Sequence, residues 1–131
     1  MKAIINYLKK CPVLSDLKVR EDYLGPESGS VAIAPDGGEQ TVKVYASGDM
    51  LGQISFKILV RENFIGSASE LLLKIADWIS CSPELPDMIG NKTSQYVEVT
   101  EGPILVKTDV GAGIYEMKLR LVYYRKGVGN E

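Results

Sequence analysis

The chain has 131 residues, 45% of them hydrophobic and 24% charged, a composition that argues for one folded domain and against disorder along its length. Fifteen basic and seventeen acidic side chains give a formal net charge of -2, which argues against a dedicated nucleic-acid binder. The chain has no histidine, so the commonest general base and the commonest transition-metal ligand are missing. Ser-His-Asp and Cys-His catalytic arrangements are therefore excluded.

An amphipathic helix is predicted over residues 2–10, and Pro12 ends it because the residue before a proline is pushed out of the helical region. Its apolar side chains share one face: Ile4, Ile5, Tyr7, Leu8 and Cys11. The run is too short and too polar for a signal peptide or a membrane span. We therefore expect a soluble protein that is made in the cytoplasm.

Three strands are expected next. The first covers residues 17–24, and the second, residues 30–34, stops at a predicted turn over residues 35–38 with the sequence Pro-Asp-Gly-Gly. The third covers residues 41–46, with its two valines on one face.

Residues 47–52 contain two glycines and a Met-Leu pair, and we expect them to form an exposed loop between strands. The following segment, residues 53–62, alternates as a long, half-buried strand. Its apolar face is made of Ile54, Phe56, Ile58 and Val60.

A second helix is predicted from Ser67, where Ser67 and Glu70 match a capping box. It carries an apolar stripe at three- and four-residue spacing: Leu71, Leu72, Ile75, Trp78 and Ile79. Pro83 and Pro86 mark its end and open a loop. Trp78 is interpreted as a core residue of this stripe.

The last strands are predicted over residues 96–101, 104–107 and 114–125. The final one alternates best, with an apolar face of Tyr115, Met117, Leu119, Leu121 and Tyr123. The order of elements predicts a single α+β domain over residues 1–131, with a mainly antiparallel or mixed sheet of five to six strands. Two helices are expected on one face of this sheet.

No group of residues predicts catalysis, a metal site or a cofactor. Cys11 and Cys81 each follow a predicted helix and are expected to be buried free thiols, although a disulfide between them stays open. The carboxylates of Glu21 and Asp22 point to opposite faces of a strand and do not converge. The glycine pair around residue 112 opens no helix, so it predicts no phosphate loop.

The polar face of the last strand is the surface that stands out. Glu116, Lys118 and Arg120 are expected to lie beside Lys57 and Arg61 of the other long strand. This charged face is either simply solvated or a surface between subunits, where the charge pattern would set register and specificity.

Four segments resemble one family. They are YLKKCP at Tyr7–Pro12, DYLG at Asp22–Gly25, LPDMIG at Leu85–Gly90 and LRLVYYRKG at Leu119–Gly127, with the long strand and the Trp78 helix between them. In this order the chain resembles the small tail terminator proteins of Gram-positive siphophages and prophages, also labelled minor capsid proteins. The resemblance spans nearly the whole chain and includes no catalytic motif.

The resemblance implies a homo-oligomeric ring, of six subunits, that stops growth of the tail tube and offers a surface for head attachment. Its implied partners are the major tail tube protein and a head-completion protein, with no membrane and no specific nucleic acid. It implies assembly in the host cytoplasm and a final place in the virion tail. It also implies that hairpin tips such as residues 47–52 order only on assembly.

The candidate interface residues are Asp49, Met50, Leu51, Lys57, Arg61, Glu116, Lys118 and Arg120. Three alternatives stay open. The chain could be another head–tail connector or tail-completion protein, or a host-encoded small binding module with a concave apolar pocket. An enzyme would have to use carboxylates, lysine or tyrosine alone.

Overall fold

The computed structural model describes residues 2–15, 17–26, 29–62, 67–109 and 112–127. Its elements are α1 (Lys2–Leu8), α2 (Pro12–Ser15), β1 (Val19–Glu21), β2 (Ser30–Val44), β3 (Met50–Glu62), α3 (Ser67–Cys81), β4 (Lys92–Asp109) and β5 (Ala112–Arg125). The strands form one five-stranded sheet in the order β1-β2-β3-β5-β4. The predicted α+β class and the single domain are confirmed, and the sheet is mixed.

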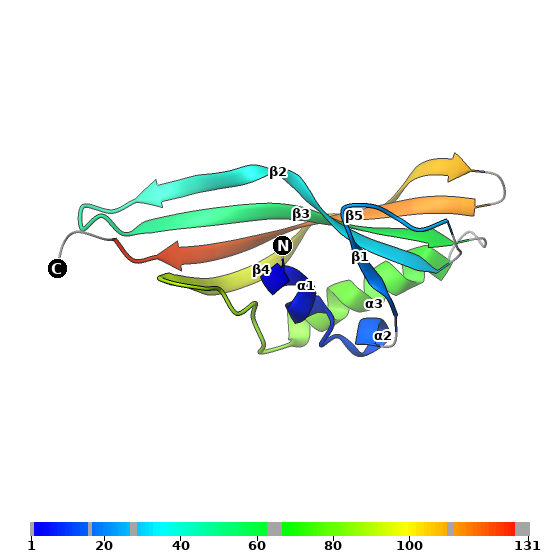
Figure 1. Cartoon of the computed structure of the whole chain (residues 1–131), viewed down its shortest axis with the longest axis horizontal. Helices are drawn as coiled ribbons and strands as arrows, with labels where there is room; N and C mark the ends of the chain where they lie inside the picture. The colour runs from blue at the N-terminus through cyan, green and yellow to red at the C-terminus, as the bar shows by residue number, and fades with distance from the viewer. Residues whose placement is uncertain (1, 16, 27–28, 63–66, 110–111, 128–131) are drawn as a thin grey trace.

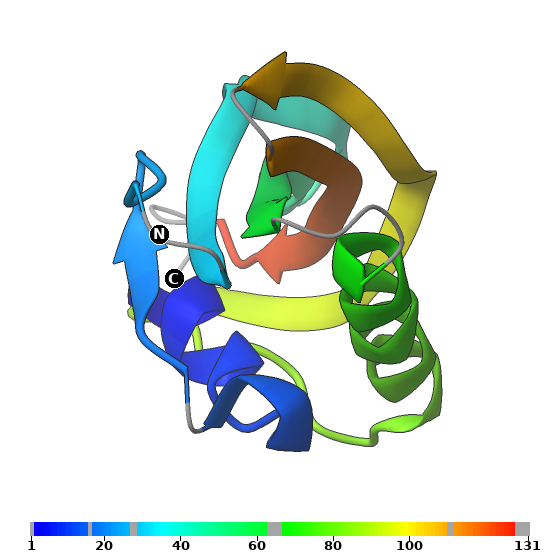
Figure 2. The same ribbon diagram turned by 90° about the vertical axis from the view of Figure 1, so that its right-hand side faces the viewer.

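The sheet is long and strongly twisted. β1 and β2 run parallel, whereas the pairs β2–β3, β3–β5 and β5–β4 are antiparallel. Figure 1 shows the helices gathered on one side, and Figure 2, which looks along the sheet, shows the outer strands curling around the central pair β3 and β5. Both ends of the sheet project beyond the helices in Figure 1.

The core lies between the helices and the sheet. Its members from β3 and β5 are residues of the predicted alternating faces, and those from α3 belong to the predicted apolar stripe. They are Phe56, Ile58, Val60, Leu72, Ile75, Ile79, Tyr115, Met117, Leu119 and Leu121. Trp78 is partly buried and packs on Tyr7 of α1, with ring centroids 5.1 Å apart. Burial of this one face explains why the period of two in β3 and β5 predicts their register well.

The first 24 residues differ from the predicted pattern. The helix α1 ends at Leu8, and Pro12 begins a second short helix instead of only ending the first, because proline suits the first helical position. The strand predicted over residues 17–24 is only Val19–Glu21, since Asp22 adopts a positive φ of 74° and ends it. α2 is therefore a third helix that the sequence pattern does not predict.

The predicted turn at residues 35–38 is wrong, because β2 continues through it as one strand. The register shifts from Pro35 opposite Phe56 to Glu39 opposite Ile54, so β2 carries two extra residues at a bulge. Gly37 supplies the positive φ of 89° that this bulge requires. The two short strands predicted beyond residue 96 are likewise one strand, β4, with several register shifts.

The helix α3 begins at Ser67 as predicted. The Ser67 side chain of the proposed capping box lies outside the described residues.

Candidate assembly surface

The predicted charged face forms on the side of the sheet away from the helices. In the sheet register Lys57 of β3 lies opposite Lys118 of β5. Like charges in this position repel each other, so each needs a carboxylate nearby. The Lys57 ammonium lies 3.4 Å from a Glu116 carboxylate oxygen, and the Lys118 ammonium lies 3.7 Å from a Glu101 oxygen.

Arg120 completes the charged face through an ion pair with Glu98 of β4. Its guanidinium also reaches the Gln53 side-chain oxygen at 3.5 Å. Three cations therefore face three carboxylates from neighbouring strands. The positive charges of these three side chains are therefore balanced by carboxylates of the same chain. Two of these carboxylates, Glu98 and Glu101, lie on a strand that the sequence predicted only weakly.

Part of this charged face is buried. One expectation from the sequence was that the face is simply exposed to solvent. Glu116 is only 9% exposed, and Ala32 and Val122 on the same side are buried as well. The curl of the outer strands in Figure 2 explains this burial, because it makes the face concave.

Arg61 also contacts the backbone of the segment that follows β1. Its Nε donates to the Gly25 carbonyl oxygen at 3.0 Å, and Gly25 N–H donates in turn to the Ser30 hydroxyl at 2.7 Å. Arg61 therefore holds the segment after β1 against the sheet.

Met50 and Leu51 do not lie in the expected exposed loop, and Asp49 is the last residue of a shorter turn. The turn is confined to residues 45–49, where Gly48 has a φ of 90° and Tyr45 N–H donates to the Asp49 carbonyl oxygen at 2.8 Å. Met50 and Leu51 are the first residues of β3, and Met50 is only 7% exposed. The prediction was wrong because pairing with β5 extends β3 to its first residue.

Asp49 ties the turn to β5 and to the residues that directly follow it. Its carboxylate accepts hydrogen bonds from the Tyr124 hydroxyl and, at 2.6 Å, from Gly127 N–H. The Tyr124 hydrogen bond is the main reason that the pKa of Asp49 is lowered, and the same bond raises the pKa of Tyr124. We call the hairpin from Glu39 to Ile54 the arm.

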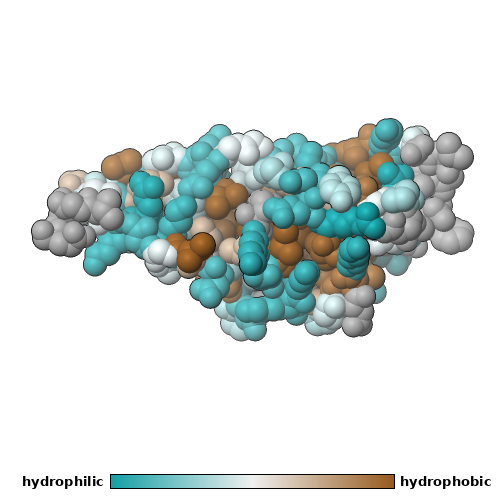
Figure 3. Space-filling view, viewed as in Figure 1, coloured by the Kyte–Doolittle hydropathy of each residue, from teal (hydrophilic) through white to brown (hydrophobic). Residues whose placement is uncertain are grey.

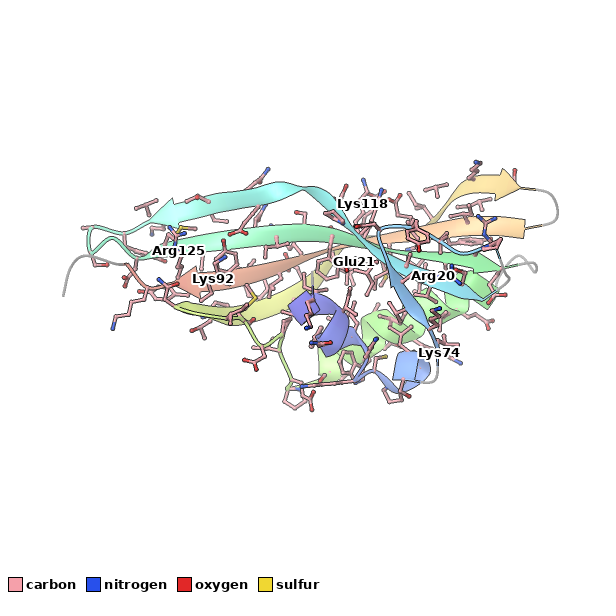
Figure 4. The ribbon with its side chains drawn as sticks, in the orientation of Figure 1. Arg20, Glu21, Lys74, Lys92, Lys118 and Arg125 are labelled. Carbon is pink, nitrogen blue, oxygen red and sulfur yellow. The ribbon has the colours of Figure 1, made fainter. Side chains whose placement is uncertain are left out.

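A buried tyrosine anchors the inner side of the arm. Tyr123 is fully buried and its hydroxyl donates to the Glu39 carboxylate. Burial, followed by this hydrogen bond, raises the pKa of Tyr123 to about 12. The same hydrogen bond is the main cause that lowers the pKa of Glu39, and Lys92 adds to it from 3.4 Å. Lys92 lies opposite Arg125 in the register, and Figure 4 shows both at the arm end of the sheet.

Two exposed apolar patches lie at opposite ends of the sheet. The arm patch consists of Val42, Val44 and Tyr45, which are 52%, 66% and 37% exposed. The tip patch consists of Ile104, Leu105 and Val106 of β4, which are 40%, 46% and 45% exposed. Ile104 pairs with Glu116 and Leu105 with Tyr115, so the tip patch extends over both faces of this outer strand. Figures 1 and 3 show these two ends far apart, with hydrophobic side chains at each. The arm patch falls in the strand predicted over residues 41–46, and the tip patch falls in the strand predicted over residues 104–107.

A cleft of about 720 Å³ opens beneath the arm. Its apolar lining comes from α1, the arm and the loop before β4: Ala3, Ile4, Ile54, Met88 and Ile89. Lys2, Asn6, Glu39, Asp87 and Lys92 supply polar groups at the same cleft. From the sequence, none of these residues was expected to line a ligand site.

The cysteines differ from each other. Both are free; Cys11 is buried, and burial raises the pKa of its thiol, whereas Cys81 is exposed. The expectation that Cys81 is buried was wrong, because two residues after Ile79 it points away from the core stripe. In the part of the chain that the structure describes, no three Cys, Asp or Glu side chains are grouped to hold a metal ion.

None of the helices within the described ranges has the length and apolar character needed to cross a membrane. No protein-family model matches this chain, and no curated protein is significantly similar to it.

Proposed function

We propose that this chain is a non-catalytic phage or prophage structural protein, a tail terminator that caps the tail tube as a homo-oligomeric ring. In this role it contacts the major tail tube protein and a head-completion protein, assembles in the host cytoplasm and ends in the virion tail. The sequence resemblance motivates the proposal.

The observation that best supports this function is the arm. It projects beyond the helices and carries an exposed apolar patch on β2, whose outer edge pairs with β1 at residues 31–33 and with no other strand of the described residues. An exposed apolar strand edge is a ready surface for another protein chain. The hydrogen bonds of Asp49 and Tyr123 hold the arm in place, which favours a preformed contact surface.

The test is a phage or prophage from which this gene is deleted, with tail lengths measured by electron microscopy. The proposed function predicts tails of uncontrolled length that fail to join heads, and their rescue by the wild-type gene. A Val44→Glu gene should fail to rescue, because it places a charge on the arm patch.

Leu73→Glu is the matched control for this rescue. Leu73 is 52% exposed on α3, away from the arm, and the L73E gene should restore normal tails. Head-joined tails of normal length in the deletion strain would rule the function out. Normal tail tubes that fail only in head joining would instead identify another head–tail connector or tail-completion protein.

The cleft favours a second candidate, a host-encoded small binding module. An apolar hollow with several polar groups at its rim is the usual form of a ligand site. An NMR screen with apolar fragments should then shift the amides of Asn6 and Met88, and Ile89→Asp should weaken that binding. An absence of shifts at these amides would remove this candidate.

A further inference from the structure

We propose that a second copy of this chain binds head to tail, with the arm patch of one copy packed against the tip patch of the next. The inference rests on the proposed ring and specifies its subunit contact. It starts from the two exposed apolar patches at opposite ends of one sheet.

Both patches belong to strands with an open edge. Among the residues that the structure describes, β1 pairs with β2 only at residues 31–33, so the arm segment of β2 is an outer edge of the sheet. β4 is the outermost strand on the other side. Apolar side chains at such edges are stabilised when another chain covers them.

The strand directions allow the sheet to continue from copy to copy. Three successive antiparallel pairings, β2–β3, β3–β5 and β5–β4, make β2 and β4 run in opposite directions. Consider a second copy that has the same orientation as the first and is only translated. Its β4 then runs antiparallel to the β2 of the first copy. Pro103 and the register shifts around it interrupt β4, so the contact depends mainly on side-chain packing.

A symmetric contact would leave one patch uncovered. If two arms paired with each other about a two-fold axis, both tip patches would stay exposed. A head-to-tail contact covers one arm patch and one tip patch at every interface. When such a chain of contacts closes, no patch remains exposed, and a closed ring results.

Cysteine cross-linking tests this contact directly. In a Cys81→Ser background, Val42→Cys and Leu105→Cys are made in separate chains, both at exposed positions. After treatment with a short bis-maleimide, an equimolar mixture should give a covalent dimer that neither variant gives alone. A chain carrying both substitutions should give a ladder of larger products.

Leu73→Cys is the control, because Leu73 is as exposed as Val42 but lies on α3. It should cross-link with neither variant. A dimer from Val42→Cys alone would show a symmetric arm contact and overturn the proposal, as would a mixture that gives no dimer at high protein concentration.

The outcomes separate this contact from the proposed function. In one outcome, the deletion strain loses control of tail length, but the Val42→Cys and Leu105→Cys mixture gives no dimer. This outcome would support the proposed function and reject the arm-to-tip contact. In the other outcome, the mixture gives the dimer, but the deletion strain makes normal tails. This outcome would support the contact and reject the proposed function.

Discussion

Gly52 is the residue on which the packing of the arm depends most directly. A Cβ at this position would lie 2.5 Å from Cζ of Tyr123 and 2.6 Å from its hydroxyl oxygen. Tyr123 cannot swing aside freely, because it is fully buried and hydrogen bonded to Glu39. We predict that Gly52→Ala lowers the free energy of unfolding by about 1–3 kcal/mol, measured by urea denaturation.

Gly102→Ala is the control for this overpacking. Gly102 also lies in a strand, β4, but no atom lies within 4 Å of a Cβ built there. The free energy of unfolding should stay within about 0.5 kcal/mol of wild type. Equal losses in the two variants would show that the Tyr123 contact is not the cause.

At the level of single residues, local pattern predicted the buried faces but not the long-range pairs. The core residues of β5 follow from alternation alone, because a strand with one buried face fixes its register. The bond between Glu39 and Tyr123 joins residues 84 positions apart. Only the complete strand order brings them together, so no local signal in the sequence could identify this pair.

The bulge in β2 is the feature of this element that depends on one glycine. Gly37 has a φ of 89°, and no atom lies within 4 Å of a Cβ built there. The cost of Gly37→Ala is therefore conformational, and we expect a loss of about 1–2 kcal/mol in the free energy of unfolding. Thermal or urea denaturation measures it.

The neighbouring Gly38 provides the control within the same bulge. It has equal space around a Cβ but no positive φ. Gly38→Ala should therefore be neutral or slightly stabilising, since alanine reduces the freedom of the unfolded chain. A loss in Gly38→Ala as large as that in Gly37→Ala would contradict this account of the bulge.

At the level of elements, the bulge in β2 shows why the turn predicted over residues 35–38 was wrong. A Pro-Asp-Gly-Gly sequence is typical of a chain reversal. Here β3 pairs with β2 on both sides of this sequence, from Ser30 opposite Arg61 to Val44 opposite Met50. Pairing along the whole partner strand outweighs the turn preference of four residues, and that partner lies outside any local window.

At the scale of the whole molecule, the arm and the body share strands but not a core. Met50 and Tyr123 are buried, yet neither belongs to the cluster beneath the helices. β3 and β5 run through both parts without interruption in their register. We therefore expect the arm to unfold together with the body, in a single transition.

Two tyrosines test this cooperativity through pH, one in the body and one in the arm. Burial is the main cause that raises the pKa of both Tyr7 and Tyr123 from 10.0 to about 12. A raised pKa in the folded state favours the protonated phenol there. The stability this contributes is present below pH 10 and is lost as the pH rises towards about 12.

Urea denaturation across this pH window should show a falling free energy of unfolding for the wild type. Tyr7→Phe and Tyr123→Phe each remove one titrating group, so each should make the fall shallower. If the arm opens independently of the body, Tyr123→Phe would leave the pH-dependent fall in the free energy of unfolding unchanged, whereas Tyr7→Phe would reduce this fall. Because β3 and β5 span both parts, we predict that both variants reduce it, and that the arm is already folded in the free chain.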